Sequence, residues 1–181
     1  MIPHGTTLVL GGARSGKSAF AEGLVCASGL ARIYVATATG GDDEMKRRIA
    51  HHRTTRADHW RTVEEPLALV DLLTRESREA NGIVVDCLTL WLSNLMHADR
   101  NVDVESTRLT DWLSTATTMV VLVSNEVGLG LVPDTPLGRD FRDAQGRLNQ
   151  QIGTVVANVA FVAAGLPLWL KRSTSSGISP S

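Results

Sequence analysis

The sequence predicts an α/β protein in which helices cover both faces of a mostly parallel central sheet. Short apolar runs rich in valine and isoleucine alternate along the chain with segments of helical periodicity, the order that β-α-β units produce. A glycine-rich stretch, Gly11-Gly12-Ala13-Arg14-Ser15-Gly16-Lys17-Ser18, follows the first apolar run and precedes a helical segment. Because parallel sheets collect ligands at the carboxyl ends of their strands, this stretch is the first candidate site.

The first strand is expected at Thr7–Leu10 and the first helix from Ser18 to about Ser28, ended by Gly29. The residues between them fit G-x-x-x-x-G-K-[ST], the phosphate-binding P-loop motif, at every fixed position. Glycines let consecutive N–H groups turn toward a phosphate, and the helix N-terminus adds positive potential. We therefore predict a nucleoside triphosphate site, with Lys17 reaching the β/γ-phosphates and Ser18 holding Mg²⁺. The alternative is a glycine turn before a helix.

The second strand, Arg32–Thr37, leads into a polar loop, so Thr37 and Thr39 are expected near the nucleotide. A helix is predicted from Asp42 to Arg53, because acidic residues occupy its first turn. A short extended piece then precedes Pro66, and an amphipathic helix is expected from Leu67 to about Arg78, before Asn81-Gly82.

The strand Ile83–Leu88 is apolar except for Asp86. A carboxylate at the end of a core strand beside a phosphate loop commonly serves Mg²⁺ or its water, as in the Walker-B arrangement; the alternative is a helix cap. The remaining expected elements are a helix beginning at Leu90, a helix at Leu109–Ala116, a strand at Met119–Val123, a functional glycine-rich loop at Ser124–Pro133, a helix at Asp140–Asn158, and strands at Val159–Gly165 and Pro167–Lys171.

The polar residues on the predicted helix at Asp140–Asn158 leave two interpretations open. They form either an ordinary solvated face or part of the site. The residues concerned are Arg142, Asp143, Arg147, Asn149 and Gln150.

The histidine pair His51-His52 is the second candidate for chemistry, because histidine can attack phosphorus and form a phosphoramidate. Neighbouring arginines would neutralise phosphate charge. Adjacent helical residues point about 100° apart, so only one histidine can face a given phosphorus. His52 shares the stripe of Met45 and Ile49 and is favoured if that stripe faces the nucleotide; the alternative is a basic surface helix.

Composition narrows the function classes. The chain has 181 residues, 43% of them hydrophobic, and a formal net charge of -1, which predicts one globular domain at 1–172 without a nucleic-acid surface. The Ser-rich end, 173–181, is expected to be disordered. Cys26 and Cys87 lack metal-ligand spacing and are expected to be buried, inert thiols. With no signal peptide or membrane span expected, we predict a cytoplasmic protein.

The ordered set of motifs resembles the bifunctional adenosylcobinamide kinase/adenosylcobinamide-phosphate guanylyltransferase family of cobalamin biosynthesis. The similarity runs from about Thr7 to Lys171, and the tail after Lys171 departs from the usual ending. The segments that carry it are Gly11–Ser18, Tyr34–Ala38, Asp42–Met45, Arg48–Arg53, His59–Thr62, Asp86–Thr89, Ser124–Gly128 and Gly130 to Pro133.

The resemblance implies a RecA-like P-loop fold, a homotrimer and two activities. ATP or GTP would phosphorylate adenosylcobinamide, and GTP would then guanylylate a histidine that passes GMP to adenosylcobinamide phosphate. The family's nucleophile corresponds to His52, in agreement with the stripe, although the tandem pair leaves His51 open. The implied GTP contacts are Gly11–Ser18, Thr37, Ala38, Thr39, Arg53, Glu64 and Asp86.

Two other functions fit the phosphate loop alone. One is a small-molecule kinase without a covalent step, in which the histidines are structural. The other is a nucleotide-dependent switch or assembly ATPase, which uses the same loop for conformational change. The switch or assembly ATPase would be expected to carry an effector segment, and none is expected from the sequence.

Overall fold

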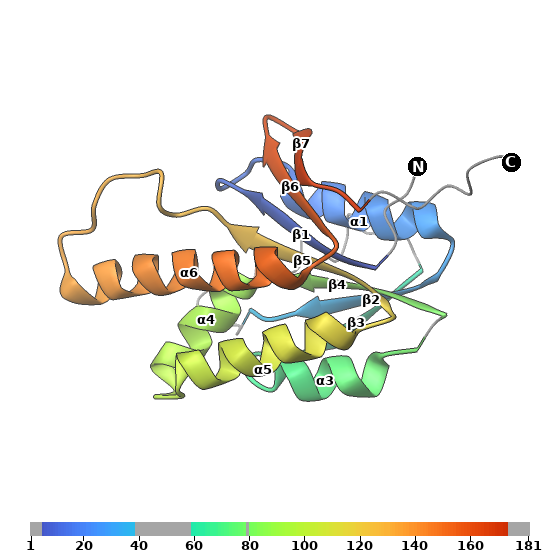
Figure 1. The fold of residues 1–181 in the computed structure, drawn as a ribbon, viewed down its shortest axis with the longest axis horizontal. Coiled ribbons are helices and arrows are strands. Elements are labelled where there is room, and N and C mark those ends of the chain that lie inside the picture. Colours follow the sequence, from blue (N-terminus) through green and yellow to red (C-terminus); the bar gives the residue numbers. More distant parts are fainter. Residues whose placement is uncertain (1–4, 39–58, 79, 174–181) are drawn as a thin grey trace, which may run out of the picture.

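A seven-stranded sheet in the order β3-β2-β4-β5-β1-β6-β7 forms the centre of the fold (Figure 1). The structure is a computed structural model and describes residues 5–38, 59–78 and 80–173. Every strand pair is parallel except β6 with β7, which confirms the predicted mostly parallel sheet. The strands are β1 (Thr6–Gly11), β2 (Ala31–Ala36), β3 (Trp60–Glu64), β4 (Asn81–Asp86), β5 (Met119–Asn125), β6 (Asn158–Ala163) and β7 (Leu166–Lys171).

Helices pack on both faces of the sheet, as expected. One face carries α1, and the opposite face carries α3, α4, α5 and α6 (Figure 1). The helices are α1 (Lys17–Ser28), α3 (Leu69–Glu76), α4 (Leu88–His97), α5 (Val102–Thr115) and α6 (Pro136–Val155). In the described ranges no helix has the length and apolar run that a membrane crossing would need.

The central strands are buried on both faces, which explains their continuous apolar sequence. On β4, Val84 packs on the α1 side while Ile83 and Val85 pack on the side of the other helices. Trp91 of α4 is fully buried, and its Nε1 donates a hydrogen bond to the Leu67 carbonyl oxygen at 3.0 Å. Two apolar layers therefore hold the sheet rigid and fix the positions of its strand ends.

Several element boundaries differ from the sequence-based expectation. Strand β4 runs from Asn81 to Asp86 rather than from Ile83 to Leu88, and helix α4 begins at Leu88 rather than Leu90. The extended piece before Pro66 is strand β3 at the edge of the sheet, so the run at 119–125 is the fifth strand. Helix α5 begins at Val102 rather than Leu109, because Asn101 accepts a hydrogen bond from Val104 N at 3.1 Å and acidic side chains follow.

Helix α6 also differs, since it begins at Pro136 and ends at Val155. Thr135 caps it by accepting a hydrogen bond from Gly138 N at 3.1 Å. Asn158, expected in this helix, instead starts β6. The helix predicted at 42–53 and most of the Ser-rich end lie outside the described residues.

A tight hairpin joins β6 to the antiparallel edge strand β7. Ala164 and Gly165 form its two-residue turn with φ values of 51° and 79°. Two consecutive positive φ values are typical of the turn whose twist matches paired strands. The turn reaches back to the first loop of the chain, as described below.

Candidate functional site

The predicted phosphate loop connects β1 directly to α1. Five residues, 12–16, separate Gly11 at the end of β1 from Lys17 at the start of α1. Within the loop, Arg14 and Gly16 have left-handed φ values of 56° and 95°, and Ser15 N donates to the Gly12 carbonyl oxygen at 3.3 Å. The chain therefore turns sharply before the helix, and the N-terminal turn of α1 lies at the carboxyl edge of the sheet.

Two of the loop glycines are required by close packing against the β6–β7 hairpin. A Cβ on Gly11 would lie 2.5 Å from the Val162 carbonyl oxygen and 2.6 Å from Ser15 Oγ. A Cβ on Gly16 would lie 3.0 Å from Gly165 Cα, and Gly165 N donates to the Ser15 carbonyl oxygen at 2.8 Å. The hairpin thus supports the loop from behind.

Lys17 and Ser15 are the two loop residues whose side chains place a polar atom in the buried interior of the loop. The Lys17 side chain is 8% exposed, and its Nζ donates to the Gly12 carbonyl oxygen at 2.9 Å. Ser15 Oγ is buried and has no hydrogen-bond partner among the described residues. A buried unpaired hydroxyl is costly, and an oxygen of a bound phosphate would satisfy it. The loop therefore fits a phosphate-bearing ligand.

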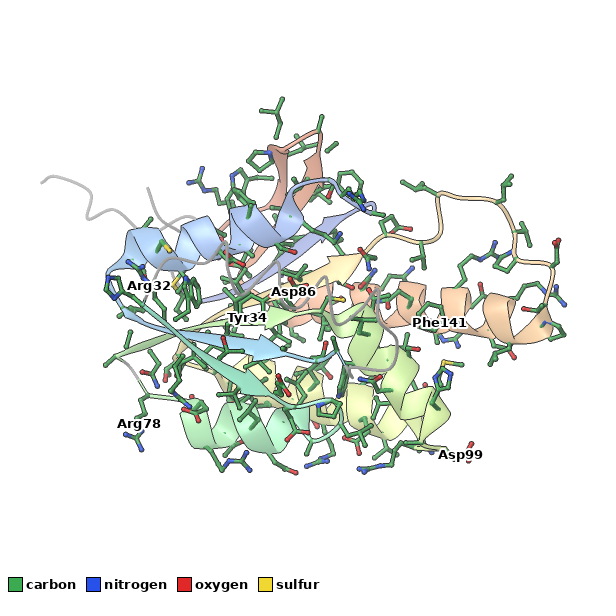
Figure 2. All side chains as sticks on the ribbon, turned by 180° about the vertical axis from the view of Figure 1, so that it is seen from behind. Arg32, Tyr34, Arg78, Asp86, Asp99 and Phe141 are labelled. Carbon is green, nitrogen blue, oxygen red and sulfur yellow. The ribbon has the colours of Figure 1, made fainter. Side chains whose placement is uncertain are left out.

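Asp86 ends β4 on the sheet face that also carries α1, because it shares the face of Val84. Tyr34 of β2 donates from Oη to Asp86 Oδ2 at 2.6 Å, and the two side chains lie side by side on neighbouring strands (Figure 2). Among the described residues, Oδ1 accepts no hydrogen bond. Tyr34 was not among the predicted site residues, since its position opposite Asp86 depends on the pairing register of β2 with β4.

Thr37 follows β2 and joins its end to the chain after Asp86. Its fully buried Oγ1 donates to the Cys87 carbonyl oxygen at 2.7 Å and accepts from Cys87 N at 2.9 Å. Thr37 N donates to the Asp86 carbonyl oxygen at 3.2 Å, and Asn94 Nδ2 donates to the Thr37 carbonyl oxygen at 2.7 Å. The Thr37 hydroxyl is thus engaged by backbone, and a contact between Thr37 and the nucleotide remains a prediction.

Cys87 directly follows Asp86 in the chain and is buried. Burial raises the pKa of its thiol to about 11, and the Asp86 carboxylate adds to that rise. The N–H groups of Leu90 and Thr89 and the Lys17 ammonium act in the opposite direction. Cys87 is a buried, protonated thiol, as expected, whereas Cys26 on α1 is only half-buried.

A buried polar cluster supports the end of β5. Ser124 Oγ donates to Asn149 Oδ1 at 2.7 Å, and Gln145 Nε2 donates to Ser124 Oγ at 2.9 Å. Asn149 Nδ2 also donates to the Asn125 carbonyl oxygen at 3.2 Å. Of the α6 residues with an open assignment, Asn149 thus faces inward while Asp143, Arg147 and Gln150 are exposed. Gln145 was missed, although its helical spacing from Leu148 and Ile152 could have indicated it.

The structure places the described site residues in two regions. The loop Gly11–Ser18 and Asp86 lie at the carboxyl edge of the sheet, where Ala38 is also half-buried just beyond β2. Glu64 is exposed at the end of β3, four strands or about 19 Å from β1 along the sheet. Three predicted residues, Thr39, His52 and Arg53, lie outside the described part of the chain.

The donor chemistry at this edge suits a hard cation. Ser18 supplies a hydroxyl and Asp86 a carboxylate, both oxygen ligands of the kind that Mg²⁺ prefers. In the ranges that the structure describes, no cluster of three His, Cys, Asp or Glu side chains could hold a metal by itself. Proteins usually bind Mg²⁺ through one or two side chains together with substrate phosphates.

Loop, sheet order and strand-end carboxylate together define a P-loop NTPase fold of the RecA-like type. Solved structures with the same fold include the flagellar accessory protein FlaH of Methanocaldococcus jannaschii, with a TM-score of 0.56 and 15% identity over 95% of this chain and 80% of that one. For the P4 protein of bacteriophage phi6 in complex with ADP, the TM-score is 0.53 and the sequence identity is 17%, over 95% of this chain and 57% of that one. At these identities the likeness shows the fold alone.

Sequence relatives define the family. A sequence model of the cobinamide kinase / cobinamide phosphate guanyltransferase family matches residues 7–170, and the chain belongs to this family. It is 51% identical over 166 residues to the bifunctional adenosylcobalamin biosynthesis protein CobP of Pseudomonas aeruginosa, covering 91% of this chain and 96% of the relative. The corresponding CobU of Escherichia coli is 37% identical over 179 residues, 91% of this chain and 98% of the relative. The predicted family and its class of transferase are confirmed.

Proposed function

We propose that the chain phosphorylates adenosylcobinamide and then converts the product to adenosylcobinamide-GDP through a GMP-histidine intermediate. The observation that carries the proposal is the family match over residues 7–170, which includes the loop Gly11–Ser18. The structure supports it with a phosphate loop whose buried Ser15 hydroxyl lacks a partner among the described residues. The protein is further proposed to act in the cytoplasm, as a homotrimer.

In the kinase step the terminal hydroxyl oxygen of adenosylcobinamide attacks the γ-phosphorus of ATP or GTP. A new P–O bond forms, the hydroxyl proton is released to water, the bond from the γ-phosphorus to the bridging oxygen breaks, and the nucleoside diphosphate leaves. The loop N–H groups and Lys17 hold the triphosphate and neutralise charge on it. Ser18 and Asp86 would hold Mg²⁺, which supplies further positive charge at the phosphate oxygens.

In the transfer step a ring nitrogen of His52 attacks the α-phosphorus of GTP. The P–N bond forms, the α-phosphorus separates from its bridging oxygen, and pyrophosphate leaves. A phosphate oxygen of adenosylcobinamide phosphate then attacks the same phosphorus, the P–N bond breaks, and free His52 returns. Ala38, Thr39, Arg53 and Glu64 are proposed GTP contacts in this step.

Labelling with GTP that carries the radioactive phosphorus at the α-position tests the covalent step. We expect the label to remain on the denatured protein, to be lost in acid and to survive base, because a phosphoramidate is acid-labile and base-stable. The His52→Ala variant should retain no label while still phosphorylating adenosylcobinamide. The matched His51→Ala variant should label normally.

Other outcomes would favour other functions. Kinase activity without retained label in the wild-type protein would support a small-molecule kinase and contradict the covalent step. Loss of label in His51→Ala instead of His52→Ala would contradict the helix-face argument. Nucleotide hydrolysis that is independent of adenosylcobinamide would support the switch ATPase.

A further inference from the structure

The Asp86 carboxylate is held by a side chain from a different strand. Tyr34 Oη donates to Asp86 Oδ2 at 2.6 Å, a short distance typical of hydrogen bonds to a charged acceptor. The partners are diagonal neighbours on one sheet face, because Ala36 of β2 pairs with Asp86 of β4. Tyr34 thus reaches forward to the carboxyl edge, where the phosphate loop lies (Figure 2).

Packing fixes the Tyr34 ring. The residue is 3% exposed and belongs to the apolar layer between the sheet and α1. The Trp60 ring meets it edge-on, with centroids 6.1 Å apart and an interplanar angle of 87°. A ring held in this way has few alternative rotamers, so its hydroxyl is preorganised for Asp86.

A second anchor from the same strand holds the chain just after Asp86. The Thr37 hydroxyl bonds both the N–H and the carbonyl oxygen of Cys87, at 2.9 Å and 2.7 Å. The side chain and the following peptide group of Asp86 are therefore fixed independently, both by residues of one neighbouring segment. If Tyr34 and Thr37 served only apolar packing, neither side chain would need its hydroxyl group.

We propose that Tyr34 is a positioning residue that orients the Asp86 carboxylate, with Oδ2 held by the phenol and Oδ1 left for the Mg²⁺ of the bound nucleotide, while Thr37 fixes the backbone beneath it. The proposal rests on the proposed function, because it assumes that Asp86 helps to hold Mg²⁺. Tyr34 acts through Asp86 and contacts neither the nucleotide nor the metal. Its loss therefore affects metal affinity more than nucleotide affinity.

The test measures Mn²⁺ binding to the full chain by electron paramagnetic resonance, in the presence of a saturating non-hydrolysable GTP analogue. We expect Tyr34→Phe to weaken Mn²⁺ binding by about tenfold or more, the usual effect of removing a hydrogen-bond partner of a metal-binding carboxylate. Without divalent metal, the affinity for the analogue should change by less than about twofold. Trp60→Phe, which keeps an aromatic ring against Tyr34, is the matched packing control and should bind Mn²⁺ as the wild type does.

A double-mutant cycle separates positioning from general destabilisation. In an Asp86→Asn background, Tyr34→Phe should weaken Mn²⁺ binding no further. A Tyr34→Phe variant with wild-type Mn²⁺ affinity, or with an equal additional loss in the Asp86→Asn background, would overturn the proposal. Thr37 gives a second comparison, in which Thr37→Val should weaken binding and Thr37→Ser, which keeps the hydroxyl, should restore it.

The same measurements distinguish failure of this proposal from failure of the proposed function. A wild-type chain that binds the analogue and Mn²⁺ but is insensitive to Tyr34→Phe overturns only the positioning role. A wild-type chain that binds no GTP analogue overturns the nucleotide site itself, and the positioning role with it.

Discussion

Replacing Gly11 by alanine tests whether the phosphate loop is held by packing against the sheet. The added Cβ would lie 2.5 Å from the Val162 carbonyl oxygen, closer than Cβ atoms approach other atoms in proteins. Ser15 Oγ, 2.6 Å away, belongs to a side chain that can turn, but the Val162 oxygen is backbone of β6. Either the loop or β6 must therefore shift.

Overpacking of this kind costs about 1–3 kcal/mol, and about 2–4 °C of melting temperature corresponds to 1 kcal/mol in a chain of this size. We expect the midpoint of thermal unfolding of Gly11→Ala to fall by roughly 2–12 °C. Urea unfolding should give a lower midpoint at an unchanged slope, because the surface exposed on unfolding stays the same.

Gly12→Ala is the matched control. The two glycines are adjacent, but a Cβ on Gly12 would meet nothing within 4 Å and its φ is not in the left-handed region. Its unfolding free energy should stay within about 0.5 kcal/mol of the wild type. Equal stability of Gly11→Ala and Gly12→Ala, or a larger loss in Gly12→Ala, would refute the packing argument.

Three further predictions concern the charges of the site. Lys17→Ala should lower both the kinase and the guanylylation rate by at least about tenfold, because one triphosphate cradle serves both; a loss of only one activity in parallel assays would contradict this. Asp86→Asn should raise the Mg²⁺ concentration needed for half-maximal activity by about tenfold or more, measured by Mg²⁺ titration, and an unchanged titration would remove Asp86 from the metal site. The pKa of Cys87 is raised from 9.0 to about 11 in the fold, so above pH 9 the unfolded chain loses its thiol proton first and stability falls. The loss of unfolding free energy reaches about 2 kcal/mol by pH 11. Urea unfolding should show that this loss disappears in Cys87→Ala and persists in Cys26→Ala.

The features that could be predicted from the sequence are those set by residues close together in the chain, such as element type and the residues at strand and helix ends. The alternation of apolar runs and helical segments predicted the parallel sheet. The position of Asp86 near the end of its strand predicted a carboxylate close to the phosphate loop. Gly29 ends α1 with a φ of 74°, as its sequence position suggested. These features depend on spacing within a few residues.

The missed features depend on pairing between distant segments. Tyr34 was seen only as a strand residue, because its contact with Asp86 requires the register of β2 against β4. The support of the loop by Gly165 requires the fold to bring the β6–β7 hairpin behind Ser15. The early start of α5 differs from the predicted helix at Leu109–Ala116, although the acidic residues after Asn101 favour a helix N-terminus.

Mass spectrometry of the protein after incubation with GTP tests the central claim most directly. We predict an adduct of one GMP per chain, located on His52 after proteolysis, removed by acid and discharged when adenosylcobinamide phosphate is added. A chain that turns over GTP with adenosylcobinamide phosphate but carries no GMP, or carries it on a residue other than His52, would contradict the account.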